Sequence, residues 1–318
     1  FGNTANMTFP SVKEYYLDNS FGKAKLIGQV VGPYKIDKSG KSDPRQPDLL
    51  LKAAIDHGIR IEKYTRIILF YPFGGCWANI GIMYNYQLPD GKSANLSISS
   101  NECTNNVNIE HELGHNFGAH HASKFNCYDN NKEFAPYFSS NCKIAEYGDK
   151  FSVMGSGIGS FNAAHKLELG WLSALNSKKV EQGTFTLRPI NIKLPAGEVQ
   201  QLRVPITEEL NLPRKNNLYY SIDFKVPSSY EHYPSFFNFT EPFVFIHIAK
   251  MTSEDPFFPQ QTILTTPIMR TLFDDLGPYT LPQGNLKAGD KLTNTLNHIE
   301  IKVDHIESDH AQITIKRI

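Results

Sequence analysis

The chain lacks an excess of charge of either sign, because its 318 residues hold 32 Lys and Arg against 32 Asp and Glu. A neutral chain has no overall field that attracts polyanions, which argues against nucleic acid as a partner. Long hydrophobic runs are also missing: the strongest, 67–73, is far shorter than the ~20 residues that span a bilayer, so we expect no membrane span. The composition, 40% hydrophobic and 20% charged, is that of a folded protein with a sizeable core.

Cysteine is scarce, and its spacing bears on metal binding and on the compartment. The four residues are Cys76, Cys103, Cys127 and Cys142. None forms a C-x-x-C pair, which argues against a zinc site made of cysteine alone. An even number favours two disulfides and an oxidising compartment over four buried thiols. Three pairings are possible; we expect Cys76–Cys103 and Cys127–Cys142, because the second bond would close a polar loop.

The first residues, Phe1–Asn6, include no initiating Met, basic stretch or apolar stretch of the kind found in a signal peptide. We therefore expect that a signal peptide and a pro-segment have been removed. Together with the cysteines, this predicts a secreted, extracellular protein. We expect it to be a monomer.

The pattern of the chain changes near residue 177. Before it, helices and strands are mixed, with helices expected at 11–17 and 47–57, strands at 25–31 and 67–71, and a turn at 89–91. After it, short alternating runs separated by Pro, Gly and Asn clusters are typical of antiparallel strands, expected at 184–187, 218–224, 243–248, 299–303 and 312–315. The sequence thus predicts an α/β domain at 1–177 and an antiparallel β-sandwich at 178–318.

The most informative stretch contains H-E-x-x-H-x-x-G-x-x-H, from His111 to His121. On a helix, His111 and His115 lie one turn apart and can present two imidazoles to one ion. Glu112 lies about 100° further round the helix, out of place as a ligand but within reach of a water molecule. Gly118 can adopt a left-handed conformation that ends the helix and returns His121 as the third ligand.

Three neutral nitrogens leave one coordination position open, which indicates one catalytic Zn²⁺ ion rather than a structural one. Zinc lowers the pKa of a bound water, and Glu112 would take its proton during attack on a carbonyl and return it to the leaving amine. Chance would produce the full motif about 0.00005 times in this composition, so the alternative of several unrelated histidines on one helix is disfavoured. The neighbouring His120 is expected to be exposed or to support the ligands indirectly.

The long motif resembles that of the metzincin metallopeptidases. Ser152-Val153-Met154-Gly155, 33 residues after His121, is similar to the Met-containing turn of that clan, where the Met forms an apolar floor below the metal. The segments 147–157 and 161–172 resemble the gametolysin family, with immune-inhibitor-A peptidases as near relatives in pattern. The similarity is concentrated at residues 107–172 and extends to 11–31 and 286–290.

This resemblance implies that 1–177 is a zinc metallopeptidase catalytic domain with a twisted mixed sheet and an active-site helix. It also implies an edge strand at 95–99, along which a substrate backbone docks as an added strand. The chain departs from astacin- and serralysin-type relatives because no Tyr stands two residues after Met154. Tyr147 is therefore the candidate hydroxyl for stabilising the transition state.

We expect a secreted zinc endopeptidase that hydrolyses peptide bonds in a protein or glycoprotein substrate. One alternative is a zinc-binding pseudo-enzyme or adhesin whose β-domain binds a surface protein or glycan, but such a protein has no need of Glu112. Another is a zinc hydrolase acting on a non-peptide acyl bond, which the Met turn disfavours.

Some further polar residues have less specific patterns. His165 and Asp149 could contact metal or substrate, but a structural role is favoured for both, with Asp149 accepting from a loop amide. The pair Asn101-Glu102 and the run 129–131 could supply ligands to a calcium ion, although their spacing does not support such a site.

Overall fold

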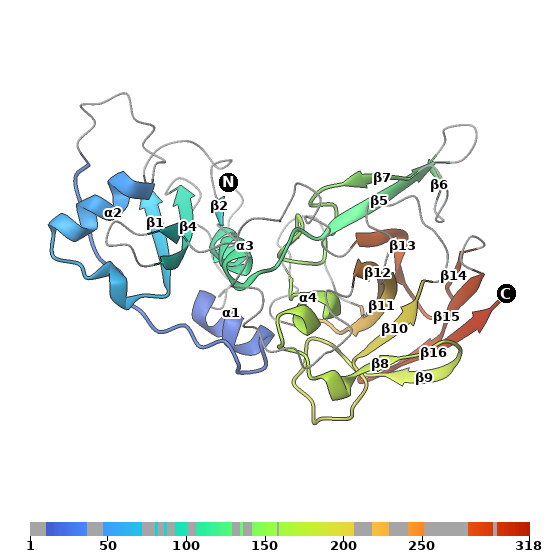
Figure 1. The fold of residues 1–318 in the computed structure, drawn as a ribbon. Helices are drawn as coiled ribbons and strands as arrows, with labels where there is room; N and C mark the ends of the chain where they lie inside the picture. Colours follow the sequence, from blue (N-terminus) through green and yellow to red (C-terminus); the bar gives the residue numbers. More distant parts are fainter. Residues whose placement is uncertain are drawn as a thin grey trace. The chain divides into compact units, whose positions relative to one another are not determined.

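The computed structural model describes residues 11–36, 47–71, 80–81, 86–87, 93–100, 106–128, 134–135, 142–157, 159–206, 218–228, 241–250, 279–294 and 298–318. The described residues form two compact units. The smaller unit contains Ser11–Tyr16 and Lys25–Ala119, and the larger unit contains Leu17–Ala24 and His120–Ile318. Both contain strands and helices, so the fold is mixed α/β with several largely antiparallel sheets (Figure 1).

The smaller unit is built on a four-stranded sheet. Its elements are α2 (Pro47–Asp56), η1 (Ile61–Lys63), β1 (Arg66–Tyr71), β2 (Ile80–Gly81), β3 (Tyr86–Gln87), β4 (Ser93–Ser100) and α3 (Asn106–Phe117). Leu50 and Leu51 of α2 pack with Ile61 and Leu69, so the apolar face of this helix covers β1. The helix α3 contacts β2 and β4, which sets the motif-bearing helix against the sheet.

The expectation of an edge strand at 95–99 is wrong. These residues lie in β4, which has β1 on one side, in parallel, and β2 on the other, antiparallel. The β2 residues Ile80 and Gly81 pair with Ile98 and Ser97. Alternation of polar and apolar residues predicts that a segment is a strand but not which strands pair with it. The pairing of β4 with the two-residue strand β2 therefore could not be predicted from the sequence.

The larger unit contains two sheets. Its elements are β5 (Ser123–Tyr128), β6 (Phe134–Ala135), β7 (Cys142–Ala145), α4 (Ala163–Glu168), η3 (Ala174–Asn176), β8 (Ser177–Lys179), β9 (Gly183–Leu187), β10 (Gln201–Pro205), β11 (Leu218–Lys225), β12 (Phe243–Lys250), β13 (Tyr279–Leu286), β14 (Lys291–Asn294), β15 (Ile299–Ile306) and β16 (Ala311–Arg317). An eight-stranded sheet runs in the order β6-β5-β13-β12-β11-β10-β8, with β7 on β5, and a four-stranded sheet runs β14-β15-β16-β9.

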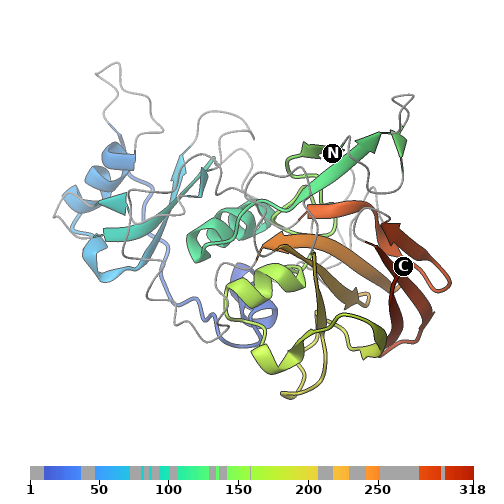
Figure 2. The same cartoon turned by 45° about the vertical axis from the view of Figure 1, so that its right-hand side comes forward.

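The two sheets of the larger unit share one hydrophobic core, and Figures 1 and 2 show them lying against each other. Alternate residues of each strand point into it. From β11 these include Tyr220 and Ile222, and from β15 and β16 they include Ile301 and Ile313. This confirms a predominantly antiparallel, two-sheet β region after residue 177.

Most of the predicted elements are present. The five strands expected after residue 177 correspond to β9, β11, β12, β15 and β16, and β1 and α2 lie where they were expected. The helix α1 (Val12–Asn19) begins with a reciprocal cap: Ser11 Oγ accepts from the Glu14 N–H at 3.3 Å, and the Glu14 carboxylate accepts from the Ser11 N–H at 2.8 Å. The strand expected at 25–31 is wrong, because this segment has no regular structure and exposes Ile27 and Val30. The expected turn at 89–91 lies outside the described residues.

The observed division of the chain differs from the boundary expected after residue 177. The units separate after Ala119, because β5 pairs with β13 and β7 pairs with β5, which brings 123–145 into the same sheet as β8–β13. No sequence pattern within 120–177 predicts that β5 pairs with β13, a strand more than a hundred residues later in the chain. The assignment of a catalytic domain to 1–177 stays a prediction.

Cys127 is disulfide-bonded, and the antiparallel register of β5 and β7 sets it directly opposite Cys142. That register is the one that the expected Cys127–Cys142 bond needs, and the pairing itself stays a prediction. The expected Cys76–Cys103 bond lies outside the described residues.

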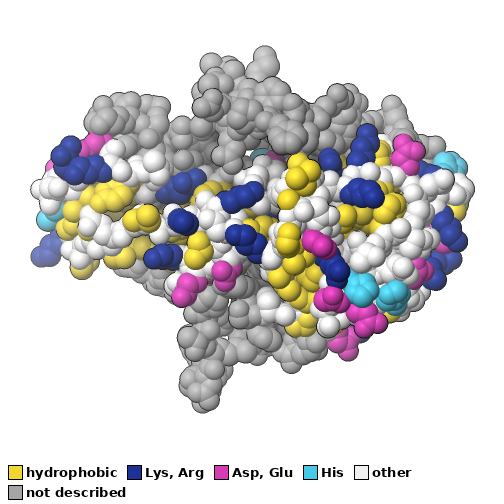
Figure 3. Space-filling model, turned by 90° about the horizontal axis from the view of Figure 1, so that it is seen from below, with side chains coloured by type: hydrophobic (Ala, Val, Ile, Leu, Met, Phe, Trp, Pro, Cys, Tyr) yellow, Lys and Arg dark blue, Asp and Glu magenta, His cyan; other side chains and the backbone are white. Residues whose placement is uncertain are grey.

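The surface agrees with a chain of balanced charge. Basic and acidic side chains are both spread over the face shown in Figure 3. Within the described part of the chain, every helix is too short or too polar to cross a bilayer.

Candidate metal centre

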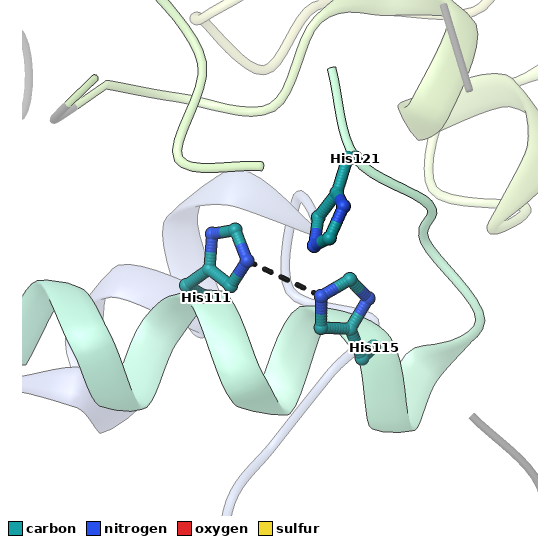
Figure 4. Close-up of side chains that lie close together, drawn as sticks. All are labelled: His111, His115 and His121. Carbon is teal, nitrogen blue, oxygen red and sulfur yellow. Dashed lines mark hydrogen bonds between the residues drawn. The ribbon is translucent and has the colours of Figure 1, made fainter. Parts of the chain in front are cut away.

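The helix α3 presents two histidines of the motif on one face. His111 and His115 are one turn apart, and their Nε2 atoms are 3.2 Å from each other (Figure 4). The rings meet edge to face, with centroids 4.9 Å apart. Both imidazoles therefore point one nitrogen toward the same place, as the spacing predicts.

The end of α3 turns the chain so that His121 comes back toward these rings. Gly118 has φ 106°, a value that side chains with a Cβ rarely adopt. Its N–H donates to the His115 carbonyl at 2.9 Å, and the Ala119 N–H donates to the Gly114 carbonyl at 3.0 Å. This pair of bonds is a Schellman motif. One ligand atom from each of His111, His115 and His121 lies within 4.8 Å of the other two, close enough to hold a metal ion.

Two of the three imidazoles are oriented by their second nitrogen. His115 Nδ1 donates to the Ala119 carbonyl at 2.8 Å, and His121 Nδ1 donates to the Glu146 carboxylate at 2.7 Å. A carbonyl and a carboxylate only accept, so in each ring Nδ1 carries a proton and Nε2 is the nitrogen available to a metal ion. Such outer hydrogen bonds are how metal-binding histidines are normally oriented.

Glu112 lies on α3 beside the histidine face and is buried. Burial raises the pKa of its carboxyl group to about 8, and a hydrogen bond from the Gly81 N–H opposes that rise. A Cβ at Gly81 would overlap the Glu112 carbonyl oxygen and would lie 2.8 Å from His115 Cβ. Only glycine therefore allows β2 to approach the helix closely enough for this contact.

A second carboxylate of α3, Glu110, is also buried, and burial raises its pKa to about 8. The Tyr16 hydroxyl donates to the Glu110 carbonyl, and the Tyr16 ring packs on Phe117, with centroids 5.0 Å apart. The Arg66 guanidinium lies over the Phe117 ring at 4.0 Å. These contacts hold α3 between α1 and β1. The sequence analysis did not single out Glu110.

Met154 is fully buried in a tight turn that is bonded to the residue after His121. Its carbonyl accepts from the Ala122 N–H at 2.7 Å, and the Asp149 N–H donates to the Ala122 carbonyl at 3.1 Å. A Cβ at Gly155 would overlap the Asp149 carbonyl oxygen, so the turn closes only around glycine. The predicted Met turn is thus a compact structure attached to the backbone at 122.

Tyr147 lies against the third histidine of the group. Its ring centroid is 3.8 Å from that of His121, and its backbone adopts φ 59°, which is uncommon for a residue with a bulky side chain. The structure therefore brings this predicted candidate next to a metal-binding position.

The remaining polar residues that the sequence singled out lie outside the group of three histidines. Asp149 accepts from the Phe151 N–H at 2.8 Å, the loop-amide contact that was favoured. His165 is fully buried in α4 and lies outside the described metal-binding group, as does His120. Both stretches considered for calcium, 101–102 and 129–131, lie outside the described residues.

Sequence reasoning missed Glu146 and Gly81. Glu146 stands 25 residues after its partner His121, and no motif connects the two positions. Gly81 belongs to a two-residue strand whose role appears only when it is placed against α3. Proximity to the Met154 turn was the only sequence signal available for Glu146.

Comparisons of this chain with protein-family models, with curated proteins and with solved structures give no match.

Proposed function

We propose that this protein is a secreted zinc-dependent endopeptidase of the metzincin type, similar to the gametolysin family. The observation that carries the proposal is the group of three histidine nitrogens within 4.8 Å, supplied by a motif whose second residue is Glu112. The Schellman turn at Gly118 and the buried Met154 turn support it, because the motif needs both to complete such a site.

The donor set suits zinc. Three imidazole nitrogens favour zinc or a similar transition metal over calcium or magnesium, which prefer oxygen. Zn–N bonds of 2.0–2.1 Å in a tetrahedron imply about 3.3–3.4 Å between ligand nitrogens. The 3.2 Å between the Nε2 atoms of His111 and His115 fits that value. When bound, zinc would supply Lewis acidity and lower the pKa of a water molecule at the site.

Within this site Glu112 acts as the general base. A zinc ion at this site would favour the charged form of Glu112 despite its burial, and the carboxylate would then receive a proton from the attacking water and deliver it to the leaving amine. The Gly81 N–H orients this carboxylate. The Tyr147 hydroxyl is the candidate donor to the developing oxyanion, and Tyr147→Phe tests that role, since loss of one such donor costs about 10²–10³-fold in kcat.

The test is cleavage of an unfolded protein such as casein, with and without a zinc chelator. Wild type should cleave and should lose this activity with the chelator. Glu112→Gln should keep one zinc ion per chain and lose about 10²–10⁴-fold in turnover, the usual contribution of a general base. Glu181→Gln, an exposed glutamate between β8 and β9, is the matched control and should retain full activity.

Each alternative predicts a different result. A wild type that holds zinc without cleaving any peptide would support the pseudo-enzyme or adhesin. Cleavage of esters but not of peptides, in a substrate panel, would support the non-peptide hydrolase. A Glu112→Gln protein as active as wild type would remove the proposed base.

A further inference from the structure

The eight-stranded sheet has a second buried face, opposite the hydrophobic core. Every residue of β11 is buried, although only alternate ones point into the core. The remaining residues of β11 and β12 include three ionisable side chains, Asp223, Lys225 and His247. A buried strand face with three ionisable groups requires partners from another segment.

The partner segment is the turn that contains Met154. His247 Nε2 donates to the Asp149 carboxylate at 3.1 Å, and its Nδ1 lies 3.5 Å from Asp223 Oδ1. Lys225 Nζ donates to the Phe151 carbonyl at 2.7 Å and to the Ser160 carbonyl at 3.0 Å. The second face of the sheet thus binds this turn at three places.

The charges of the neighbouring side chains indicate whether the His247 imidazole is neutral or protonated. Asp149, Asp223, Lys225 and His247 are each at most 2% exposed. His247 is the cationic partner at ion-pair distance from Asp149 and Asp223 among the described residues, so with a neutral imidazole both buried carboxylates would lack one, and such unpaired charge is very costly. The carboxylate oxygens of Asp223 have no hydrogen-bond donor among the described residues, and the His247 imidazole lies within ion-pair distance of them.

The same arrangement shifts the pKa of the imidazole. Burial alone would lower the pKa of His247, but its contacts with Asp149 and Asp223 outweigh burial and raise it to about 9. The same face of the sheet carries Lys225 on β11 and Arg203 on β10, whose cross-strand partner Ser221 also pairs with His247. Burial lowers the pKa of His165 on α4 to about 3, so this ring stays neutral. The His247–Asp149 contact is thus an ion pair at neutral pH.

Asp149 connects this ion pair to the third histidine of the metal group. Its carboxylate binds His247 and the Phe151 N–H, while its backbone N–H donates to Ala122, the residue after His121. Ala122 in turn donates to Met154. Movement of Asp149 would therefore move the backbone on which His121 is mounted.

We propose that His247 is a positioning residue for His121: as an imidazolium between Asp149 and Asp223, it fixes the Met154 turn and thereby the third metal ligand. The proposal rests on the zinc site of the proposed function. His111 and His115, which are mounted on a helix, do not depend on this pair.

The first test measures zinc affinity of the full chain by competition with a chromophoric chelator. His247→Gln should bind zinc roughly tenfold more weakly than wild type at pH 7, the lower end of the effect of residues that orient ligands. Asp223→Asn should weaken binding less, because it leaves the Asp149 contact intact. His305→Gln, an exposed histidine of β15, is the matched control and should bind as wild type does.

A purely structural packing role would not depend on pH. The ratio of wild-type to His247→Gln affinity should therefore approach one as the pH rises above about 9, where the wild-type imidazole loses its charge. NMR of the histidine ring nitrogens in wild type provides a measurement that needs no variant. It should show both nitrogens of His247 protonated at pH 7.5.

The outcomes separate this proposal from the proposed function. Equal zinc affinity in wild type and His247→Gln, or a neutral His247 ring at pH 7.5, overturns the positioning role and leaves the peptidase proposal standing. A wild type that binds no zinc overturns the proposed function and the positioning role together. Zinc binding without peptide cleavage overturns the peptidase alone.

Discussion

Two segments support the candidate metal centre, and they do so by different means. His111 and His115 are placed by α3, a regular helix in which spacing alone sets two rings on one face. His121 is placed by irregular backbone, bonded to Glu146 by its ring and followed by Ala122, which is bonded to the Met154 turn. Local geometry is sufficient for the first pair, whereas the third ligand relies on side chains far away in the sequence.

The largest expected effect distinguishes the two adjacent histidines after α3. His121→Ala should weaken zinc binding by about 100-fold or more, since sharing a typical zinc affinity over four ligands assigns roughly 3 kcal/mol to each. His120→Ala, the matched control, lies outside the metal-binding group and should retain zinc. Isothermal titration with zinc measures both. If His120→Ala lost zinc and His121→Ala kept it, the assignment of the third ligand would be wrong.

The two buried histidines His165 and His247 should give the free energy of unfolding opposite dependences on pH, because their pKa shifts are opposite. His247 has a folded pKa of about 9, so its contribution is fully present below its ordinary pKa and is lost as the pH rises through about 9. That loss is about 3 kcal/mol. His165 has a folded pKa of about 3, so stability falls as the pH drops below about 6.5. Denaturant unfolding of wild type and of each single variant at pH 5, 6.5 and 9 measures both contributions, because the difference between two profiles cancels the titration of the buried Glu110 and Glu112.

Single variants assign each pH-dependent contribution to its histidine. His247→Gln should remove the loss between about pH 6.5 and 9 that this imidazole carries and keep the acid loss, and His165→Gln should do the reverse. Identical pH profiles for wild type and His247→Gln would show that this imidazole does not carry the shift.

Overpacking the Met154 turn should cost about 1–3 kcal/mol of unfolding free energy. Gly155→Ala places a methyl group against the Asp149 carbonyl oxygen, so the turn must open. Gly28→Ala is the control, since a Cβ there meets no atom within 4 Å. Thermal unfolding compares the two. A Gly155→Ala protein as stable as Gly28→Ala would mean that the turn is not tightly closed.

The smallest expected effect concerns the carboxylate that orients His121. Glu146→Gln keeps the size of the side chain and one acceptor oxygen but removes the charge, and should weaken zinc binding roughly tenfold. Glu181→Gln is again the exposed control. Chelator competition measures the difference, and a change in Glu181→Gln of the same size would point to a general effect of charge.

Sequence reasoning predicted those features that depend on near neighbours along the chain. The cap at Ser11, the helices α2 and α3, and the five strands after residue 177 follow from spacing and from Gly and Pro. It was wrong where an element needs a distant partner. Lys25–Val31 is rich in apolar residues like a strand but pairs with no strand among the described residues, and β4 has a second neighbour, β2, that spans only two residues.

By itself the sequence determined that two histidines share a helix face, that a glycine ends that helix and that a tight turn around Met154 follows, because each depends on backbone geometry within a few residues. Tertiary structure alone decided what supports the third histidine. Glu146 bonds the ring of His121, and Asp149 meets His247 because β5 enters the same sheet as β12 and one face of that sheet is buried under the turn. Burial is outweighed there by opposite charge, which lowers the pKa of Asp149 and raises that of His247, and neither effect can be read from spacing along the chain.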